Sequence, residues 1–443
     1  MKKMKARLAP VYFEEGINRQ EFDGQLGTLT SLLADEAEFL PPIALGAPIP
    51  AEADAVVFPQ LVGEAYRQLQ RFKEIQVPML VVTSEFGTMA MWDWEIVTFL
   101  RAEGIDVFAP YRLEQTRTLC RALGFKRDMR RTKFLVFQDN PGEGMQASIF
   151  KRFFWWEDEC VQRIQDAFGI SVVKKSFKQL GAEAKRISDA EAEEVLRQWE
   201  IPAEGVTARA MNSAVKLYAA VKRELDLDDR IRGVGINCLN ESFHSDTTPC
   251  LAWSMLYEER GIMWACEGDI LSLLTKYILH NTLQAPVMMS NLYPFLMGMT
   301  ALKHEKIPSF PDVAEPENHL LVGHCGFFGL MPKSFAADWK LKPKVLGIVD
   351  DNATAVDARY SLGDLTIAQF HPTLTKMIAV KGDLIDYAGY PGSDCRNGGV
   401  IRVGDGHKLM SSLYSHHGCF IPGRKEDELV LVSRILGMGL EKV

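Results

Sequence analysis

Residues 262–280 read IMWACEGDILSLLTKYILH, which is an apolar run, a short polar turn and an amphipathic stretch. This order predicts a buried β-strand, a turn around Glu267, and a helix from residue 270. Upstream, GVGINCL at 233–239 predicts a second strand, and the helical stretch between the two strands makes them parallel neighbours. Glu267 should therefore lie at the carboxyl edge of a parallel sheet, where open α/β sheets bind ligands.

The same alternation of apolar runs and helical stretches continues on both sides of this segment. It predicts two Rossmann-like parallel-sheet α/β domains, at residues 1–130 and 131–305. From about residue 340 the sequence turns to β-rich runs such as KVLGIV (344–349), separated by Gly, Asp and Asn turns. We therefore expect a β-rich, barrel-like C-terminal domain at 306–443.

Composition excludes several classes of partner. The formal net charge is -8 and no Lys/Arg-rich stripe is present, so nucleic acid is not an expected partner. The basic opening has no apolar segment behind it, and no run of 18 apolar residues occurs later, which predicts a cytoplasmic protein with no membrane partner. The eight cysteines form no CxxC pairs and are expected to be reduced core residues.

Three carboxylates near the predicted sheet edge are candidate catalytic residues: Glu267, Asp269 and Glu241. Glu267 directly follows its strand and is also a candidate metal ligand. Asp269 is equally well placed to cap the following helix, and this role alone explains its identity. Glu241 follows the neighbouring strand and could face the same cleft, or it could be a solvated loop carboxylate.

Two histidines stand in apolar surroundings. His324 lies in LLVGHCGFFGL, and His417 is the second member of the pair in LYSHHGCF. A single buried histidine is more often a hydrogen-bonded core residue than a ligand. Together with Glu267, however, the mixture of imidazole and carboxylate suits Mn²⁺ or another divalent metal that keeps open positions for substrate oxygens.

These segments, CEGD (266–269), HCG (324–326) and SHHG (415–418), resemble the L-fucose isomerase and L-arabinose isomerase superfamily. The resemblance implies a metal-dependent sugar isomerase that acts on a free monosaccharide through a cis-enediol. It also implies metal ligation by Glu267, His417 and His324, and a homo-oligomer, either trimer or hexamer. The aromatic run FKRFFWWED (150–158) is a candidate subunit contact, and the alternative is that it forms part of the core within one domain.

The sequence departs from the family at one position. The resemblance places a second metal-binding carboxylate roughly two dozen residues after Glu267, where this chain has Asn291. An amide oxygen can coordinate a divalent ion but adds no charge and cannot accept a proton near neutral pH. Two alternatives to an active isomerase stay open. The missing carboxylate would permit a metal- or sugar-binding homologue without isomerase activity. The other alternative is a cysteine-dependent hydrolase that uses Cys325 beside His324, although adjacent residues on a strand point to opposite faces and do not easily form a nucleophile-base pair.

Overall fold

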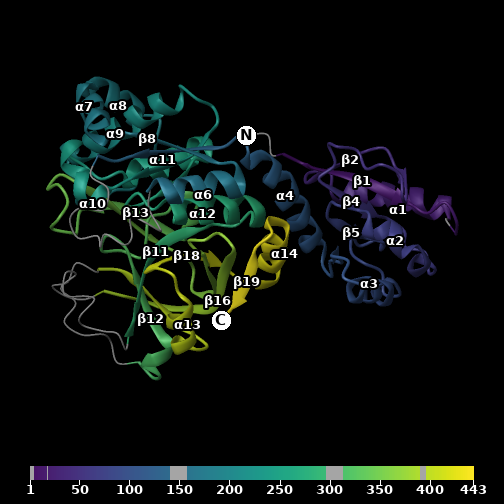
Figure 1. Ribbon diagram of the computed structural model, residues 1–443. Helices are drawn as coiled ribbons and strands as arrows, with labels where there is room; N and C mark the ends of the chain where they lie inside the picture. The colour runs from purple at the N-terminus through teal and green to yellow at the C-terminus, as the bar shows by residue number, and fades with distance from the viewer. Residues whose placement is uncertain (1–3, 17, 140–156, 296–312, 390–395) are drawn as a thin grey trace.

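The computed structural model describes residues 4–16, 18–139, 157–295, 313–389 and 396–443. Within this part the chain forms a parallel α/β layer, a second parallel α/β layer, and a closed antiparallel barrel, as Figure 1 shows. The fold class expected from the sequence is thereby confirmed. The aromatic run at 150–158 lies almost wholly outside the described residues.

The N-terminal sheet is parallel, in the order β2-β1-β4-β5-β6, with β3 also paired to β1. All four residues of β4 are buried, as expected for a parallel strand with both faces covered. The strands are β1 (Ala6–Tyr12), β2 (Ala37–Phe39), β3 (Ile43–Ala44), β4 (Ala55–Phe58), β5 (Met79–Val81) and β6 (Val107–Phe108). The helices are α1 (Arg19–Leu32), α2 (Leu69–Lys73), α3 (Asp93–Ala102) and α4 (Leu113–Met129).

The central sheet is also parallel, in the order β10-β9-β7-β8. The predicted pairing of the strands before and after the crossover helix is confirmed, because β9 and β10 are parallel neighbours. The strands are β7 (Lys133–Phe137), β8 (Ser171–Lys175), β9 (Ile231–Ile236) and β10 (Met263–Ala265). The helices are α6 (Asp158–Phe168), α7 (Phe177–Arg186), α8 (Asp189–Leu196), α9 (Ala208–Leu225), α10 (Cys238–Glu241), α11 (Cys250–Arg260) and α12 (Ile270–Leu283).

The C-terminal part is an antiparallel barrel in the order β15-β18-β11-β12-β17-β16, closed by the pairing of β15 with β16. A further strand, β19, adds to β16 in parallel, and β13 pairs with β14 as a separate hairpin. The strands are β11 (Met288–Pro294), β12 (His319–Gly323), β13 (Asp338–Pro343), β14 (Thr354–Arg359), β15 (Gly363–Phe370), β16 (Lys376–Ala388), β17 (Gly398–Val403), β18 (His417–Pro422) and β19 (Gly439–Lys442). Two helices, α13 (Gly406–Ser412) and α14 (Glu426–Leu436), follow β17 and β18.

Two local predictions differ from the structure. The run at 344–349 is not a strand; it belongs to the connection between β13 and β14, whose pairing already ends at Pro343. The strand β11 pairs with β12 and β18, so it lies in the barrel sheet although the sequence analysis grouped it with the central domain. An apolar run does not reveal which sheet it will join, because strand pairing is a long-range choice.

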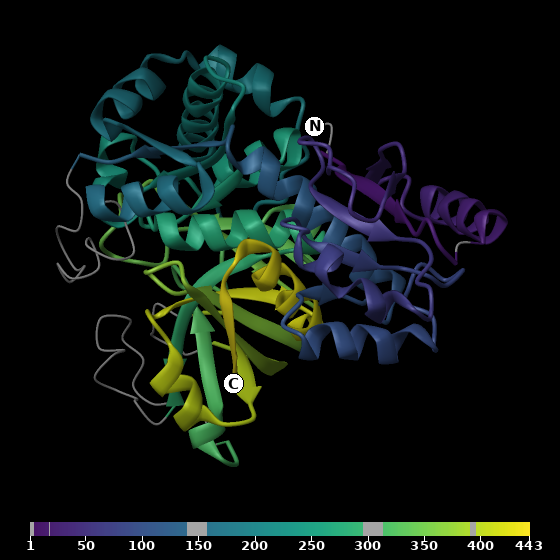
Figure 2. The same cartoon turned by 45° about the vertical axis from the view of Figure 1, so that its right-hand side comes forward.

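Helix α12 connects the central sheet to the barrel. It contacts β9 and β10 on one side and β15 and β18 on the other, and its apolar surface is buried nearly all round. Helix α4 lies between the N-terminal layer and the rest, where it packs against α12 and α14. Figure 2 shows the same arrangement from a second direction. In the described parts of the chain, every helix is too short or too polar to cross a membrane.

Candidate metal centre

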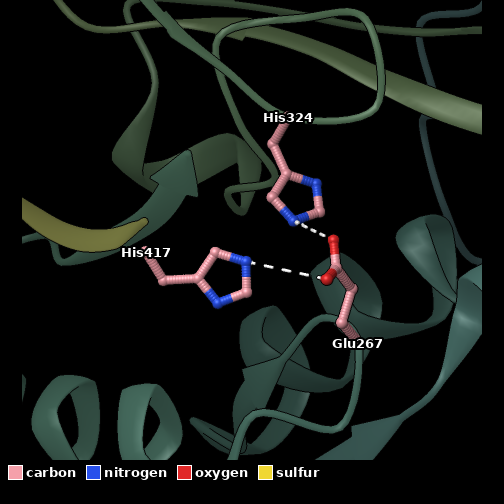
Figure 3. A group of neighbouring side chains, drawn as sticks. All are labelled: Glu267, His324 and His417. Carbon is pink, nitrogen blue, oxygen red and sulfur yellow. Dashed lines mark ion pairs between the residues drawn. The ribbon is translucent and has the colours of Figure 1, made fainter. Parts of the chain in front are cut away.

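Glu267, His324 and His417 come together where the central sheet meets the barrel. One ligand atom from each lies within 4.8 Å of the others, and all three side chains are buried. Glu267 follows β10 by two residues, His324 follows β12, and His417 is the first residue of β18. Figure 3 shows both imidazole rings presenting a nitrogen to the carboxylate, with Nε2–O distances of 3.3 Å for His324 and 3.7 Å for His417.

The turn that carries Glu267 has an unusual backbone. Glu267 has φ +57° and Gly268 has φ +70°, so two consecutive residues adopt the left-handed conformation. Glycine does so freely, but a glutamate in this conformation is held there at a cost of about 1–3 kcal/mol. Strain of this kind is concentrated at functional sites, and here it turns the chain sharply between β10 and α12.

Asp269 both caps a helix and holds a histidine. Its Oδ1 accepts the Ser272 backbone N–H at 2.8 Å, which confirms the predicted cap of α12. Its Oδ2 lies 2.7 Å from His417 Nδ1, and because a carboxylate only accepts, this ring nitrogen donates. The bond leaves His417 Nε2 directed at Glu267. A carboxylate behind a histidine is the usual means of fixing the orientation of a metal-ligating imidazole.

A glutamine that sequence reasoning missed supports the segment leading into His417. Gln369, on β15, is buried; its Oε1 accepts the Tyr414 N–H at 2.9 Å and its Nε2 donates to Ser415 Oγ at 2.8 Å. The same Nε2 also donates to the carbonyl of His417. Gln369 therefore positions the backbone that presents the histidine. Its place in an ordinary β-run gives no sequence signal of this role.

The groups around Glu267 favour the ionised form of its carboxylate. Burial alone would raise the pKa of Glu267, but the hydrogen bond from His324 and the nearby His417 outweigh it and hold that pKa below its ordinary value. Burial would lower the pKa of His417, but Asp269 and Glu267 outweigh it and raise that pKa. For the adjacent His416, burial prevails and lowers the pKa to about 3, so this ring is neutral near pH 7.

Asn291 lies between the two histidine-bearing strands. It is on β11, directly opposite His417 of β18 and Gly323 of β12, the residue before His324. Residues directly opposite in an antiparallel pair share a face, with Cβ atoms about 5 Å apart. The amide Nδ2 donates to Tyr293 Oη at 2.9 Å, whereas Oδ1 is buried and has no hydrogen-bond donor. This unpaired oxygen belongs to a side chain on the same face of the sheet as His417.

Glu241 lies at the same sheet edge but outside the Glu267 group. It is fully buried, and its Oε1 accepts the Asp139 backbone N–H at 2.9 Å. The interpretation of Glu241 as a solvated loop carboxylate is therefore wrong. Glu241 is the last residue of α10, and this hydrogen bond joins the helical turn to the segment that follows β7.

Cys325 contacts His324. From the sequence, such a contact was expected to be difficult, because neighbouring residues on one strand point to opposite faces. Cys325 has φ +55°, which turns the chain so that Sγ lies 3.1 Å from His324 Nδ1. Burial raises the pKa of the Cys325 thiol well above its ordinary value. A nucleophilic cysteine needs the opposite shift, so the structure does not favour the hydrolase.

One carboxylate oxygen and two imidazole nitrogens, all buried and close together, form a donor set that could hold a divalent metal ion. Such a set fits a cation of borderline hardness and leaves some of its coordination positions open. The predicted ligands Glu267, His324 and His417 are thus brought together, while Asn291 as a fourth ligand stays a prediction.

Comparisons with known proteins add little to this description. No family model matches the chain, and no curated protein matches it. Among solved structures, the chain is similar to a solute-binding protein of an ABC transporter from Burkholderia multivorans, with 11% sequence identity. The match covers 62% of this chain and 93% of the other, with a TM-score of 0.15, and at that level it carries no argument about fold or function.

Proposed function

We propose that the protein is a metal-dependent aldose-ketose isomerase that acts on a free monosaccharide, with Mn²⁺ as the metal. The observation that carries this proposal is the buried Glu267, His324 and His417 group at the carboxyl edge of a parallel sheet. The resemblance to the L-fucose and L-arabinose isomerases supports it at the same three residues. The two histidines and the glutamate suit Mn²⁺, which accepts both nitrogen and oxygen ligands.

The reaction divides its tasks among the residues of this edge. When bound, the cation supplies Lewis acidity toward two adjacent sugar oxygens. Glu267, ionised at neutral pH, would hold the cation together with His324 and His417. Asp269 is already engaged by His417 and Ser272, so it positions a ligand and does not move protons. Of the three carboxylates predicted to be catalytic, Glu241 is the one that remains as a candidate for moving a proton between C1 and C2 of the sugar.

A second candidate function is a metal- or sugar-binding homologue without isomerase activity. Asn291 favours it, because the resemblance places a carboxylate at this position and an amide cannot accept a proton there. The neutral amide also leaves the centre with one negative charge fewer than the family arrangement.

The two candidates differ in a direct assay. The Mn²⁺-loaded protein is incubated in deuterated solvent with pentoses, hexoses and 6-deoxyhexoses, and NMR follows exchange of the C2 hydrogen. Metal-dependent exchange supports the isomerase. In that case Asn291→Asp should have little effect or lower the rate, because a new charge perturbs its neighbours. If no sugar exchanges but Asn291→Asp creates activity, the binding homologue is the better description.

The resemblance also leads us to propose a homo-oligomer, either trimer or hexamer, in the cytoplasm. The seven cysteines in the described residues are free thiols, which suits a reducing compartment. Several large apolar side chains of the N-terminal layer are exposed in the single chain, including Phe86, Trp92 and Tyr111. A closed assembly would cover such a surface.

A further inference from the structure

Two buried amides near the metal centre lack hydrogen-bond partners. Gln138 is 5% exposed and Asn237 is fully buried, yet neither the amide oxygen nor the amide nitrogen of either side chain makes a hydrogen bond. Buried polar groups are nearly always paired, and an unpaired one is costly. Two such amides side by side therefore point to a missing partner, which is either ordered water or a ligand.

Strand register places both amides in one row, at the sheet edge that also carries Glu267. Phe137 of β7 pairs with Ile236 of β9, so the next residues, Gln138 and Asn237, directly follow neighbouring parallel strands that lie about 4.8 Å apart. Gly235 of β9 pairs with Ala265 of β10, and Asn237 and Glu267 each come two residues after this pair. The row lies at the carboxyl edge of the sheet, where ligands bind.

The row is also held in place. The Glu241 backbone N–H donates to the Asn237 carbonyl at 3.2 Å, and the Glu241 carboxylate accepts the Asp139 N–H directly after Gln138. The carboxylate of Asp139 in turn accepts the Lys178 N–H at 2.8 Å, at the start of α7. Both amide-bearing strand ends are thus fixed through their backbones, which leaves the side chains for another task.

Two neutral amides select a particular kind of ligand. Each offers an acceptor oxygen and a donor NH₂ group, which together match hydroxyl groups, since a hydroxyl also both donates and accepts. The row carries no cationic side chain for a phosphate or carboxylate. We propose that Gln138 and Asn237 form a subsite that binds the hydroxyl groups of a sugar or alditol beyond the two oxygens nearest the metal. The inference rests on the proposed function only where it concerns isomerisation; the binding of hydroxyl groups by the two amides does not depend on isomerase activity.

The test uses calorimetry on the full-length, Mn²⁺-loaded protein with a panel of pentitols, hexitols and 6-deoxyhexitols, which have the hydroxyls of a sugar but cannot be isomerised. Ethylene glycol serves as a short probe, because its two hydroxyl groups fill the two positions nearest the metal and leave none for the amides. The variants are Gln138→Met and Asn237→Leu, which keep side-chain size and remove hydrogen bonding, with Gln76→Met at an exposed position as the control.

We expect each variant to bind the best alditol about tenfold more weakly, which is what one neutral hydrogen bond contributes. Mn²⁺ affinity and ethylene glycol binding should stay within twofold of the wild type, and the melting temperature should not fall, because an unpaired buried amide has been removed. Equal alditol binding by wild type and variants would show that the amides hold only water, and absence of any alditol binding would likewise overturn the proposal.

If Gln138→Met or Asn237→Leu fails to fold, the shorter variants Gln138→Ala and Asn237→Ala are tested in its place. If these also fail to fold, the amides are structural and the subsite is refuted. The proposed function fails differently: no C2 exchange with any sugar, together with alditol binding that depends on both amides, removes the isomerase and keeps the subsite.

Discussion

The two parallel sheets of this chain have the same architecture but very different carboxyl edges. After β5 and β6 of the N-terminal sheet come Phe86, Trp92 and Tyr111, whose exposed fractions are 69%, 76% and 88%. After β7, β9 and β10 of the central sheet come Gln138, Asn237 and Glu267, all of which are buried. One edge presents apolar groups to solvent, and the other presents polar groups to the interior.

The difference follows from what covers each edge. The barrel contacts α12 of the central layer through β11, β15 and β18, and it contributes both histidines. Exclusion of water strengthens the interaction of Glu267 with any cation and makes each unpaired polar group more costly. A parallel sheet edge is therefore only a potential site. In this chain, the barrel supplies the two histidines that complete a group of three candidate metal ligands at this edge.

The largest expected effect is at Glu267. Glu267→Gln removes the negative charge of the group, so Mn²⁺ affinity, measured by electron paramagnetic resonance of the free ion, should fall, and any C2 exchange should slow at least ~100-fold. Glu85→Gln, at the exposed edge after β5, is the matched control and should change neither. Glu241→Gln should slow exchange and leave Mn²⁺ affinity intact. Equal Mn²⁺ binding by Glu267→Gln and wild type would remove Glu267 from the centre.

His417 should account for most of the stabilisation by metal. An ion that binds only the folded protein adds about 2.7 kcal/mol at a hundredfold excess over its Kd. Mn²⁺ should therefore raise the melting temperature of chelator-treated wild type, and His417→Ala should lose most of that rise. His407→Ala, at an exposed position of α13, is the control. An undiminished rise in His417→Ala contradicts the assignment.

The sequence predicted those parts of this centre that depend on short-range patterns. Glu267 after a buried strand, Asp269 as a cap and the parallel pairing of β9 with β10 all follow from short-range patterns. His324 and His417 were identified by resemblance, and their approach to Glu267 could not be derived from spacing. It depends on how β12 and β18 flank β11 in the closed barrel.

The residues that were missed share a cause. Gln138 and Asn237 each end an apolar strand in the sequence, so they were visible as strand-end residues, but only the register of β7, β9 and β10 sets them in one row. Gln369 acts on a backbone segment more than forty residues away. Long-range pairing of this kind leaves no mark in a single sequence.

A smaller effect is expected at Lys276, a fully buried cation on α12 that is bonded to the Trp264 carbonyl at 2.8 Å. Burial lowers the pKa of Lys276 to about 7. Between pH 7 and 10 the unfolded chain then binds more protons than the folded one, so stability should rise with pH by up to ~1.4 kcal/mol per pH unit. Lys276→Met should remove this slope in urea unfolding at pH 7, 8 and 9. Lys73→Met, on α2 of the N-terminal layer, should keep it, and a slope retained by Lys276→Met would show that the slope comes from another group.

The smallest effect on folding is expected at the exposed edge. Trp92 precedes α3 and makes no capping hydrogen bond, so Trp92→Ala should change the free energy of unfolding of the isolated chain by less than ~0.5 kcal/mol. If Trp92 and Phe86 are covered by another subunit, the same substitution should weaken association, because burial of a large aromatic side chain contributes about 1.5–3 kcal/mol. Sedimentation across a range of concentrations separates the two quantities. Leu227→Ala removes an exposed apolar side chain next to the central sheet, between α9 and β9, and should leave assembly unchanged. A wild type that is monomeric at micromolar concentration would contradict the proposed oligomer, and it would leave the aromatic edge as a surface that this chain does not use for self-association.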